Sequence, residues 1–137
     1  MKKLLAEFYG EKPEESDSYG RIVNDRHFQR LINLIDKSKV AIGGQSNAND
    51  RFISPTIMTG VSKDDRVMQE EIFGPILPFI SVKDLNEAIN FVNAREKPLA
   101  LYVFTNSTSV FEEFKEKTSS GSFGLNEVLM QISCNNF

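Results

Sequence analysis

Residues 76–117 read ILPFISVKDLNEAINFVNAREKPLALYVFTNSTSVFEEFKEK, and this stretch decides the fold class. Two apolar runs of strand length, 76–82 and 99–104, alternate in it with two amphipathic helical patterns. Asp84 predicts the cap of the first helix, with Glu87 at capping-box spacing, and 107–117 predicts the second helix. Strand, helix, strand, helix is typical of a βαβ unit, and near-continuous apolar strands favour a parallel sheet covered on both faces. We therefore predict a single α/β domain.

Helices are also predicted in the first part of the chain. Residues 2–9 form an amphipathic pattern that Gly10 can end. Asn24 and Asp25 can cap a second helix over 26–36. The apolar positions of that second helix follow the i, i+3, i+4, i+7 pattern and are Phe28, Leu31, Ile32 and Ile35.

Extended segments follow these helices. Residues 39–42 predict a short strand and 43–50 a turn. Residues 51–58 predict a strand interrupted by Pro55, which favours an edge position or a bulge. The end of the chain, 125–132, is also expected to be extended.

Composition excludes several classes of protein. The 137 residues carry a net charge of -3 with both signs interspersed, so no basic stripe offers itself to nucleic acid. No apolar run reaches the ~18 residues of a membrane helix, and Glu7 ends the short apolar start too early for a secretion signal. The single cysteine, Cys134, excludes an internal disulfide and fits a cytoplasmic protein. One histidine and one distant cysteine predict no zinc site.

The most informative motif is 68–75, MQEEIFGP. Two adjacent carboxylates, an aromatic residue and Gly-Pro form an unusual turn before an apolar strand. A purely structural interpretation is a helix end stopped by Gly74 and Pro75, with Phe73 in the core.

Residues 69–75, QEEIFGP, resemble the Glu-Glu-Ile-Phe-Gly-Pro signature of aldehyde dehydrogenases. Further segments resemble the class 3, fatty-aldehyde branch, in the same order and at similar spacing, so that the resemblance covers nearly the whole chain. These segments are EFYG (7–10), YGRI (19–22), RHF (26–28), SPT (54–56), REKPLALY (95–102) and TSSG (118–121). The resemblance implies the later part of a Rossmann-like, parallel-sheet catalytic domain, incomplete in this chain.

The resemblance also implies site residues. In this family the second Glu of the signature hydrogen-bonds the nicotinamide ribose of NAD or NADP, and the Phe packs against the ribose and nicotinamide. Carried over, these residues are Glu71 and Phe73. A carboxylate can accept two ribose hydroxyls, and an aromatic wall limits the orientation of the ring. Glu70 is expected to be a surface or capping acid.

The resemblance implies no catalytic residue in this chain. The family's nucleophilic cysteine precedes the signature in a Gly-Gln-x-Cys context, whereas Cys134 follows it in ISCNN (132–136). The catalytic Glu and the Gly-rich dinucleotide turn have no counterpart either. The chain alone is therefore expected to be inactive, as part of an enzyme that oxidises fatty or aromatic aldehydes to acids through a cysteine thiohemiacetal. A hydrolase using Cys134, or a Cys134–His27 dyad, lacks a flanking base and an oxyanion motif.

The resemblance divides the chain into 1–121, the later part of the catalytic domain, and 122–137, the start of the strand that bridges the family's dimer. Residues 125–132 are thus a candidate interface strand, or an ordinary edge strand. Asn126 falls where the family has an Asn. A homodimer is expected for the parent enzyme, with a possible endoplasmic reticulum anchor outside this chain. An alternative function is a non-catalytic module that pairs with a full-length aldehyde dehydrogenase.

Overall fold

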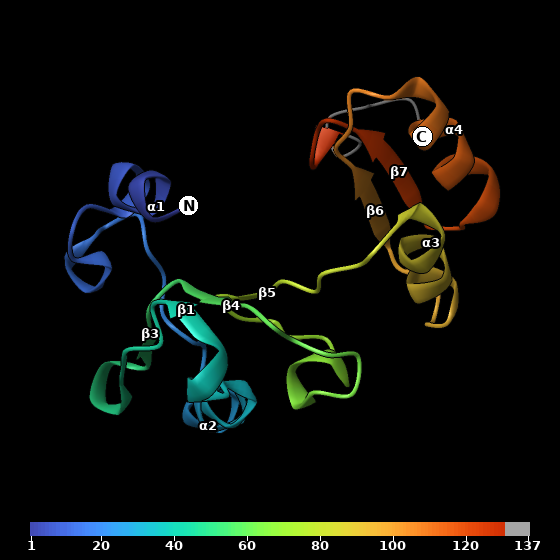
Figure 1. The fold of residues 1–137 in the computed structure, drawn as a ribbon. Helices are drawn as coiled ribbons and strands as arrows, with labels where there is room; N and C mark the ends of the chain where they lie inside the picture. Colours follow the sequence, from blue (N-terminus) through green and yellow to red (C-terminus); the bar gives the residue numbers. More distant parts are fainter. Residues whose placement is uncertain (131–137) are drawn as a thin grey trace. The chain divides into compact units, whose positions relative to one another are not determined.

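The computed structural model describes residues 1–130. Contacts divide the chain into two compact units, Met1–Ser81 and Val82–Phe137, and the described part of each is treated by itself. Figure 1 shows the first unit in blue to green and the second in yellow to red. The α/β class expected from the alternation of helical and strand patterns is confirmed.

The first unit is built on a three-stranded sheet in the order β1-β4-β5. Its strands are β1 (Val40–Ile42), β4 (Thr56–Met58) and β5 (Ile76–Pro78). β1 pairs antiparallel with β4 through an irregular register, and β4 pairs parallel with β5, with Thr56 opposite Ile76. A two-stranded antiparallel ribbon of β2 (Ser46–Asn47) and β3 (Phe52–Ile53) lies within the predicted turn and strand.

Two α-helices of the first unit begin and end close to the predicted positions. They are α1 (Lys2–Tyr9) and α2 (Asp25–Leu34). Gly10 ends α1 with φ 78°, a conformation that glycine adopts without steric penalty. The side chain of Asn24 accepts a hydrogen bond from the His27 backbone N–H, as the predicted cap requires. Four short 3-10 helices complete the unit: Pro13–Glu15, Lys37–Lys39, Ala48–Asp50 and Arg66–Met68.

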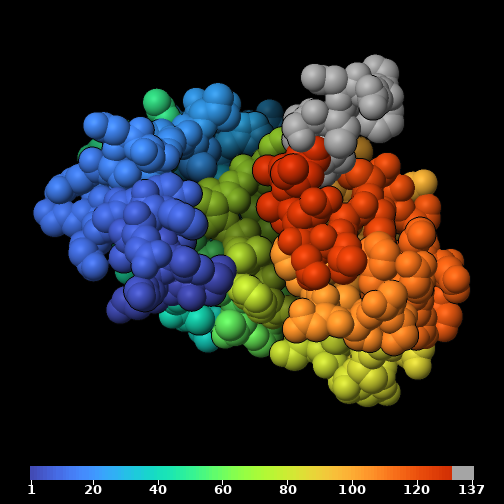
Figure 2. All heavy atoms as spheres, turned by 90° about the horizontal axis from the view of Figure 1, so that it is seen from above, coloured from blue at the N-terminus to red at the C-terminus, as the bar shows by residue number. Residues whose placement is uncertain are grey.

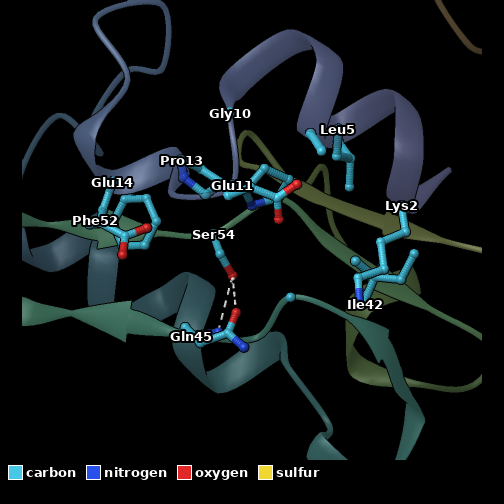
Figure 3. Close-up of a pocket in the computed structure, with 13 residues that line it drawn as sticks. Lys2, Leu5, Gly10, Glu11, Pro13, Glu14, Ile42, Gln45, Phe52 and Ser54 are labelled. Atoms are coloured by element: carbon cyan, nitrogen blue, oxygen red, sulfur yellow. Dashed lines mark hydrogen bonds between the residues drawn. The ribbon is translucent and has the colours of Figure 1, made fainter.

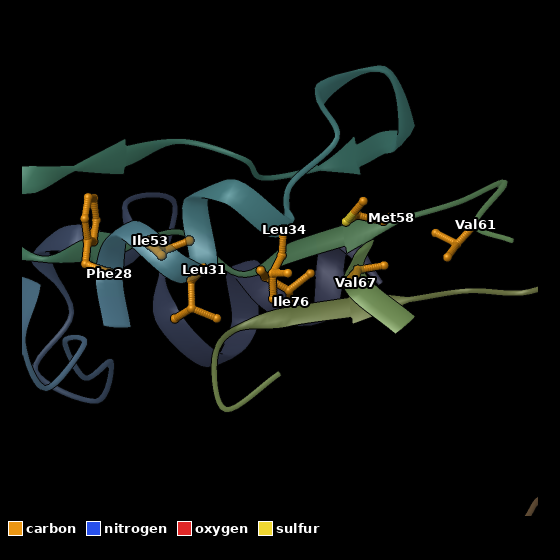
Figure 4. Packing of buried hydrophobic residues seen from close by; sticks show 8 residues of the cluster. All are labelled: Phe28, Leu31, Leu34, Ile53, Met58, Val61, Val67 and Ile76. Atoms are coloured by element: carbon orange, nitrogen blue, oxygen red, sulfur yellow. The ribbon is translucent and has the colours of Figure 1, made fainter. Parts of the chain in front are cut away.

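The core of the first unit lies between α2 and the sheet (Figure 4). The residues that form it come from α2, from the strands and from the segment between β4 and β5. They are Phe28, Leu31, Leu34, Ile53, Met58, Val61, Val67 and Ile76. Of the predicted apolar face of α2, Ile32 and Ile35 pack against this core from partly buried positions, and Leu34 takes a buried place.

The second unit is a strand, helix, strand arrangement preceded by a helix. Its elements are α3 (Leu85–Asn93), β6 (Ala100–Val103), α4 (Thr108–Lys117) and β7 (Ser122–Leu125). β6 and β7 are parallel, with Ala100 opposite Ser122, so α4 is the crossover between them. The Asp84 side chain accepts from the Glu87 backbone N–H, which confirms the predicted cap. The Glu87 carboxylate accepts from the backbone N–H of Lys83, one residue before the cap, where a capping box would use that of Asp84.

Three predictions about strands are wrong. β5 and β6 belong to different sheets, so the predicted βαβ unit is formed by β6, α4 and β7 instead. The predicted interruption at Pro55 is found, since β3 ends at Ile53 and β4 begins at Thr56, but the edge position is wrong because β4 is the central strand of its sheet. Pro55 is tolerated there because its missing N–H falls outside the ladder. The strand predicted over 125–132 is not found in its described part: β7 ends at Leu125, and Asn126 turns the chain with φ 56°. Residues 131–132 of that prediction lie outside the described residues.

The prediction of strands covered on both faces also fails within the described residues. Leu77 of β5 is exposed, as are Phe79, just after β5, and Leu99, just before β6. The apolar side of α1 is exposed as well, since Phe8 is 67% exposed. Figure 2 shows this helix in dark blue on the face in view. Within residues 1–130, no helix combines the length and apolar character needed to cross a membrane.

Candidate functional site

The motif predicted to bind a ligand forms a loop, residues 69–75, between the 3-10 helix Arg66–Met68 and β5. Its last residues are tied to the sheet. The Thr56 backbone N–H donates to the carbonyl of Pro75 at 2.8 Å, and the Ile76 N–H donates to the carbonyl of Gly74 at 2.9 Å. The loop therefore leaves the sheet edge from a fixed point.

Two apolar contacts join the loop to the core of the first unit. Ile72 packs against the core, and Gly74 lies on Leu31 of α2, which is fully buried. A Cβ at Gly74 would lie 2.5 Å from Leu31 Cδ2, closer than carbon atoms approach in proteins. A side chain at position 74 would therefore displace the buried Leu31 side chain.

Between these two anchors, Phe73 points away from the core. Its side chain is 77% exposed, and its backbone is left-handed with φ 46°. The purely structural interpretation, with Phe73 in the core at a helix end, is therefore wrong. A left-handed conformation costs a non-glycine residue on the order of 1 kcal/mol, and an exposed phenyl ring recovers little of this by burial. Such strain on an exposed aromatic residue is typical of binding sites.

Arg30 of α2 fastens the backbone of the same loop. Its Nη2 donates to the Ile72 carbonyl oxygen at 2.5 Å, and its Nη1 donates to the Glu71 carbonyl oxygen at 3.4 Å. Nη1 also pairs with the Glu70 carboxylate at 2.8 Å. Glu70, expected to be a surface or capping acid, is a surface acid in an ion pair. Sequence reasoning missed Arg30, because a residue 40 positions before Glu70 carries no local signal of this contact.

Glu71 and Phe73, which Ile72 separates, are thus two exposed residues of one loop whose backbone Arg30 holds. The Glu71 side chain is exposed, as is the Phe73 ring. An exposed carboxylate can accept hydrogen bonds from a pair of hydroxyls, and an exposed ring offers a flat apolar face. The pair is chemically suited to a ligand that carries both a diol and a planar ring.

Other residues considered from the sequence are not brought to this loop. His27 is exposed near the start of α2, and Cys134 lies outside the described residues. The amide of Asn126 binds both backbone groups of Thr105: Oδ1 accepts from the N–H at 2.8 Å and Nδ2 donates to the carbonyl at 2.9 Å. Asn126 thereby ties the end of β7 to the segment after β6. Among residues 1–130, no group of histidine, cysteine and acidic side chains could hold a metal ion.

A cavity of about 330 Å³ lies elsewhere in the first unit, between α1, the segment after it and the ends of β1 and β3 (Figure 3). On its floor, Ser54 Oγ accepts from the Gln45 backbone N–H and donates to the Gln45 side-chain oxygen, each at 3.0 Å. Ser54 Oγ and Gln45 Oε1 therefore bind each other in this cavity. Neither Glu71 nor Phe73 lines this cavity.

Comparison with known proteins shows which family this sequence matches. The model of the aldehyde dehydrogenase family matches residues 1–137. The dimeric NADP-preferring aldehyde dehydrogenase of Mus musculus is 53% identical over 133 residues, which are 97% of this chain and 29% of the mouse protein. Aldehyde dehydrogenase family 3 member A2 of Pongo abelii is 48% identical over 137 residues, 100% of this chain and 28% of its own.

Solved structures agree with these relatives. The substrate-bound state of Staphylococcus aureus AldH superimposes with a TM-score of 0.93 at 40% identity, over 96% of this chain and 29% of that one. A Mycobacterium tuberculosis aldehyde dehydrogenase complexed with NAD+ gives 0.72 at 26% identity, over 83% of this chain and 26% of its own. The chain thus spans under a third of the length of these proteins.

Proposed function

Because this chain belongs to the aldehyde dehydrogenase family, we propose that it supplies the nicotinamide-ribose contacts of an NAD(P)-dependent aldehyde dehydrogenase. In this proposal the Glu71 carboxylate accepts the ribose hydroxyls and the Phe73 ring packs against the ribose and nicotinamide. The cofactor, when bound, accepts the hydride that leaves the substrate carbon. The observation that carries the proposal is the strained, exposed Phe73, two residues after the exposed Glu71 in the same loop.

The reaction proposed for the whole enzyme is the oxidation of fatty or aromatic aldehydes to carboxylic acids. A cysteine thiolate adds to the aldehyde carbon to form a thiohemiacetal, loss of hydride yields a thioester, and water releases the acid and the thiol. The role of this chain is confined to orienting the nicotinamide, because an aromatic wall restricts which ring face meets the substrate. We propose no catalytic residue among its 137 residues and no activity for the chain alone.

Choice of cofactor and assembly follow the relatives in this proposal. The mouse relative is named dimeric and NADP-preferring, which favours a homodimer and leaves both NAD and NADP open. The division into 1–121 as the later part of the catalytic domain and 122–137 as the start of the bridging strand remains a proposal. A cytoplasmic parent enzyme, with a possible endoplasmic reticulum anchor elsewhere in it, belongs to the same proposal.

A second function is the non-catalytic module that pairs with a full-length aldehyde dehydrogenase. Exposed apolar side chains just after β7 favour it, namely Val128, Leu129 and Met130. Residues 126–130, the described part of the expected edge after Leu125, have no strand geometry, so the support for pairing is their exposed apolar side chains. Size-exclusion chromatography with a full-length class 3 enzyme distinguishes the two: co-elution in a fixed ratio supports the module.

The proposal is tested by placing these residues in a complete enzyme. A chimera replaces the matching segment of the mouse relative with this chain, and aldehyde-dependent formation of NAD(P)H is measured. We expect an active chimera, in which Glu71→Gln and Phe73→Ala each lower kcat/KM for the cofactor by about tenfold or more. Glu11→Gln, an exposed acid outside the loop, is the control. Unchanged kinetics for both loop variants would contradict the proposal, and the chain alone is expected to form no NAD(P)H.

A further inference from the structure

The guanidinium of Arg30 contacts two successive peptide groups before Phe73. The Ile72 carbonyl, at 2.5 Å, belongs to the peptide that ends at the nitrogen of Phe73, and the Glu71 carbonyl, at 3.4 Å, belongs to the peptide before it. We propose that Arg30 is the positioning residue of the nicotinamide site, which holds Glu71 and Phe73 in the orientation that meets the ribose. This inference rests on the proposed function of these two residues.

Arg30 restrains the backbone torsion that sets the direction of the Phe73 ring. The φ angle of Phe73 is rotation about its N–Cα bond, and the peptide plane on one side of that bond is held by Nη2 of Arg30. With that plane fixed, a φ of 46° sends the side chain outward. Without it, the backbone is free to return to the right-handed or extended region that a phenylalanine prefers.

The contact to the backbone, more than the ion pair, carries this role. The Glu70 carboxylate is half exposed, and ion pairs at such positions contribute little. The planar guanidinium fork can meet two acceptors at a fixed spacing, whereas a lysine ammonium is a single rotatable point charge. Lysine at position 30 should therefore restore part of the effect, and removal of the Glu70 charge should matter little.

The neighbouring residue of α2 restrains the other side of Phe73. Leu31 is fully buried beneath Gly74, so the backbone after Phe73 is set by packing while the backbone before it is set by Arg30. Adjacent residues of one helix thus fasten both sides of the exposed aromatic residue. Because Leu31 also belongs to the core, only Arg30 can be changed without disturbing the hydrophobic cluster.

The experiment uses the isotope-labelled 137-residue chain and a millimolar titration with nicotinamide mononucleotide, followed by the amide signals of Glu71 and Phe73. Arg30→Gln keeps most of the aliphatic stem and removes the fork. We expect its binding to weaken by roughly tenfold, with altered Phe73 and Gly74 signals before the ligand is added. Arg30→Lys should recover part of the loss, and Glu70→Gln should bind within about twofold of the parent chain.

Arg51→Gln is the matched control, because Arg51 also binds a carboxylate and a carbonyl, those of Asp25 and Ile22, away from the loop. It should leave nucleotide binding unchanged. Equal binding by the parent chain and Arg30→Gln, or equal losses in Arg30→Gln and Arg51→Gln, would overturn the inference while the proposed function stands. Absence of any response in the parent chain would overturn this inference for the chain, while the kinetics of the chimera decide the proposed function separately.

Discussion

Leu31 of α2 occupies the space that a side chain at Gly74 would need. A Cβ built at Gly74 meets both terminal methyl groups of Leu31, at 2.5 and 2.6 Å. The contact joins the hydrophobic core of the first unit to the loop that presents Glu71 and Phe73. The position of the candidate site is therefore coupled to core packing.

Gly74→Ala should destabilise the chain by about 1–3 kcal/mol, because the added methyl displaces a side chain that is fully buried. Urea unfolding at neutral pH measures the change. Gly20→Ala is the control, since a Cβ there meets nothing within 4 Å. A change at Gly74 no larger than at Gly20 would mean that Leu31 does not hold the loop.

Replacement of Phe73 tests the strain in its backbone. With φ at 46°, Phe73→Gly should be more stable than Phe73→Ala by about 1 kcal/mol, because glycine alone adopts this conformation without a Cβ clash. Both variants lose the aromatic ring, so the comparison isolates the backbone term. Thermal or urea unfolding of the two proteins provides the measurement. If alanine is as stable as glycine, the residue is not strained.

Tyr19 should give the chain an alkaline pH dependence. Its hydroxyl donates to the Ile53 carbonyl at 2.7 Å, and burial, with a smaller contribution from Tyr9, raises the pKa of Tyr19 above its usual range. The unfolded chain therefore loses this proton first, near pH 10, and stability falls as the pH rises further. The slope should be below ~1.4 kcal/mol per pH unit, because the half-buried group is screened by solvent.

Tyr19→Phe supplies the comparison for that pH dependence. The variant should lose about 1 kcal/mol at neutral pH with the hydrogen bond, and its stability should decline less steeply than that of the parent chain above pH 10. Urea unfolding at a series of pH values from neutral to alkaline measures both. Parallel curves for the two proteins would show that Tyr19 titrates normally.

In the second unit, Asp84→Ala should destabilise α3 by about 1 kcal/mol. The carboxylate accepts from the Glu87 backbone N–H at 2.8 Å, which satisfies one of the free donors in the first turn. Faster amide hydrogen exchange at the start of α3 reports the loss. Ser107→Ala is the comparison, because the Ser107 cap of α4 is long, 3.4 Å, and should contribute less. A larger effect at Ser107 than at Asp84 would contradict this order.

Local features were predictable from sequence for a common physical reason. The caps at Asn24 and Asp84, the end of α1 at Gly10 and the helical stripe of α2 depend on residues within one or two turns of each other. Neighbours along the chain decide such features whatever the rest of the fold does. The signature at 69–75 was recognisable in the same way, as an unbroken run of residues.

Strand partners could not be predicted, because pairing depends on residues distant in sequence. The apolar runs at 76–82 and 99–104 look alike as strands, yet β5 pairs with β4 and β6 pairs with β7. The central position of β4, despite Pro55 before it, likewise depends on β1 and β5 arriving on its two sides. The apolar pattern of a strand shows that it is buried in a sheet, but it does not identify the neighbouring strands.

The sequence by itself determined the family, the α/β class, the helix limits and the identity of the two candidate ligand-binding residues. Only the tertiary structure decided that Phe73 points outward, that Gly74 lies against Leu31 and that Arg30 holds the intervening backbone. The physical reason is that a side chain's direction follows from its backbone torsion. At this loop that torsion is set by α2, some 40 residues earlier in the chain.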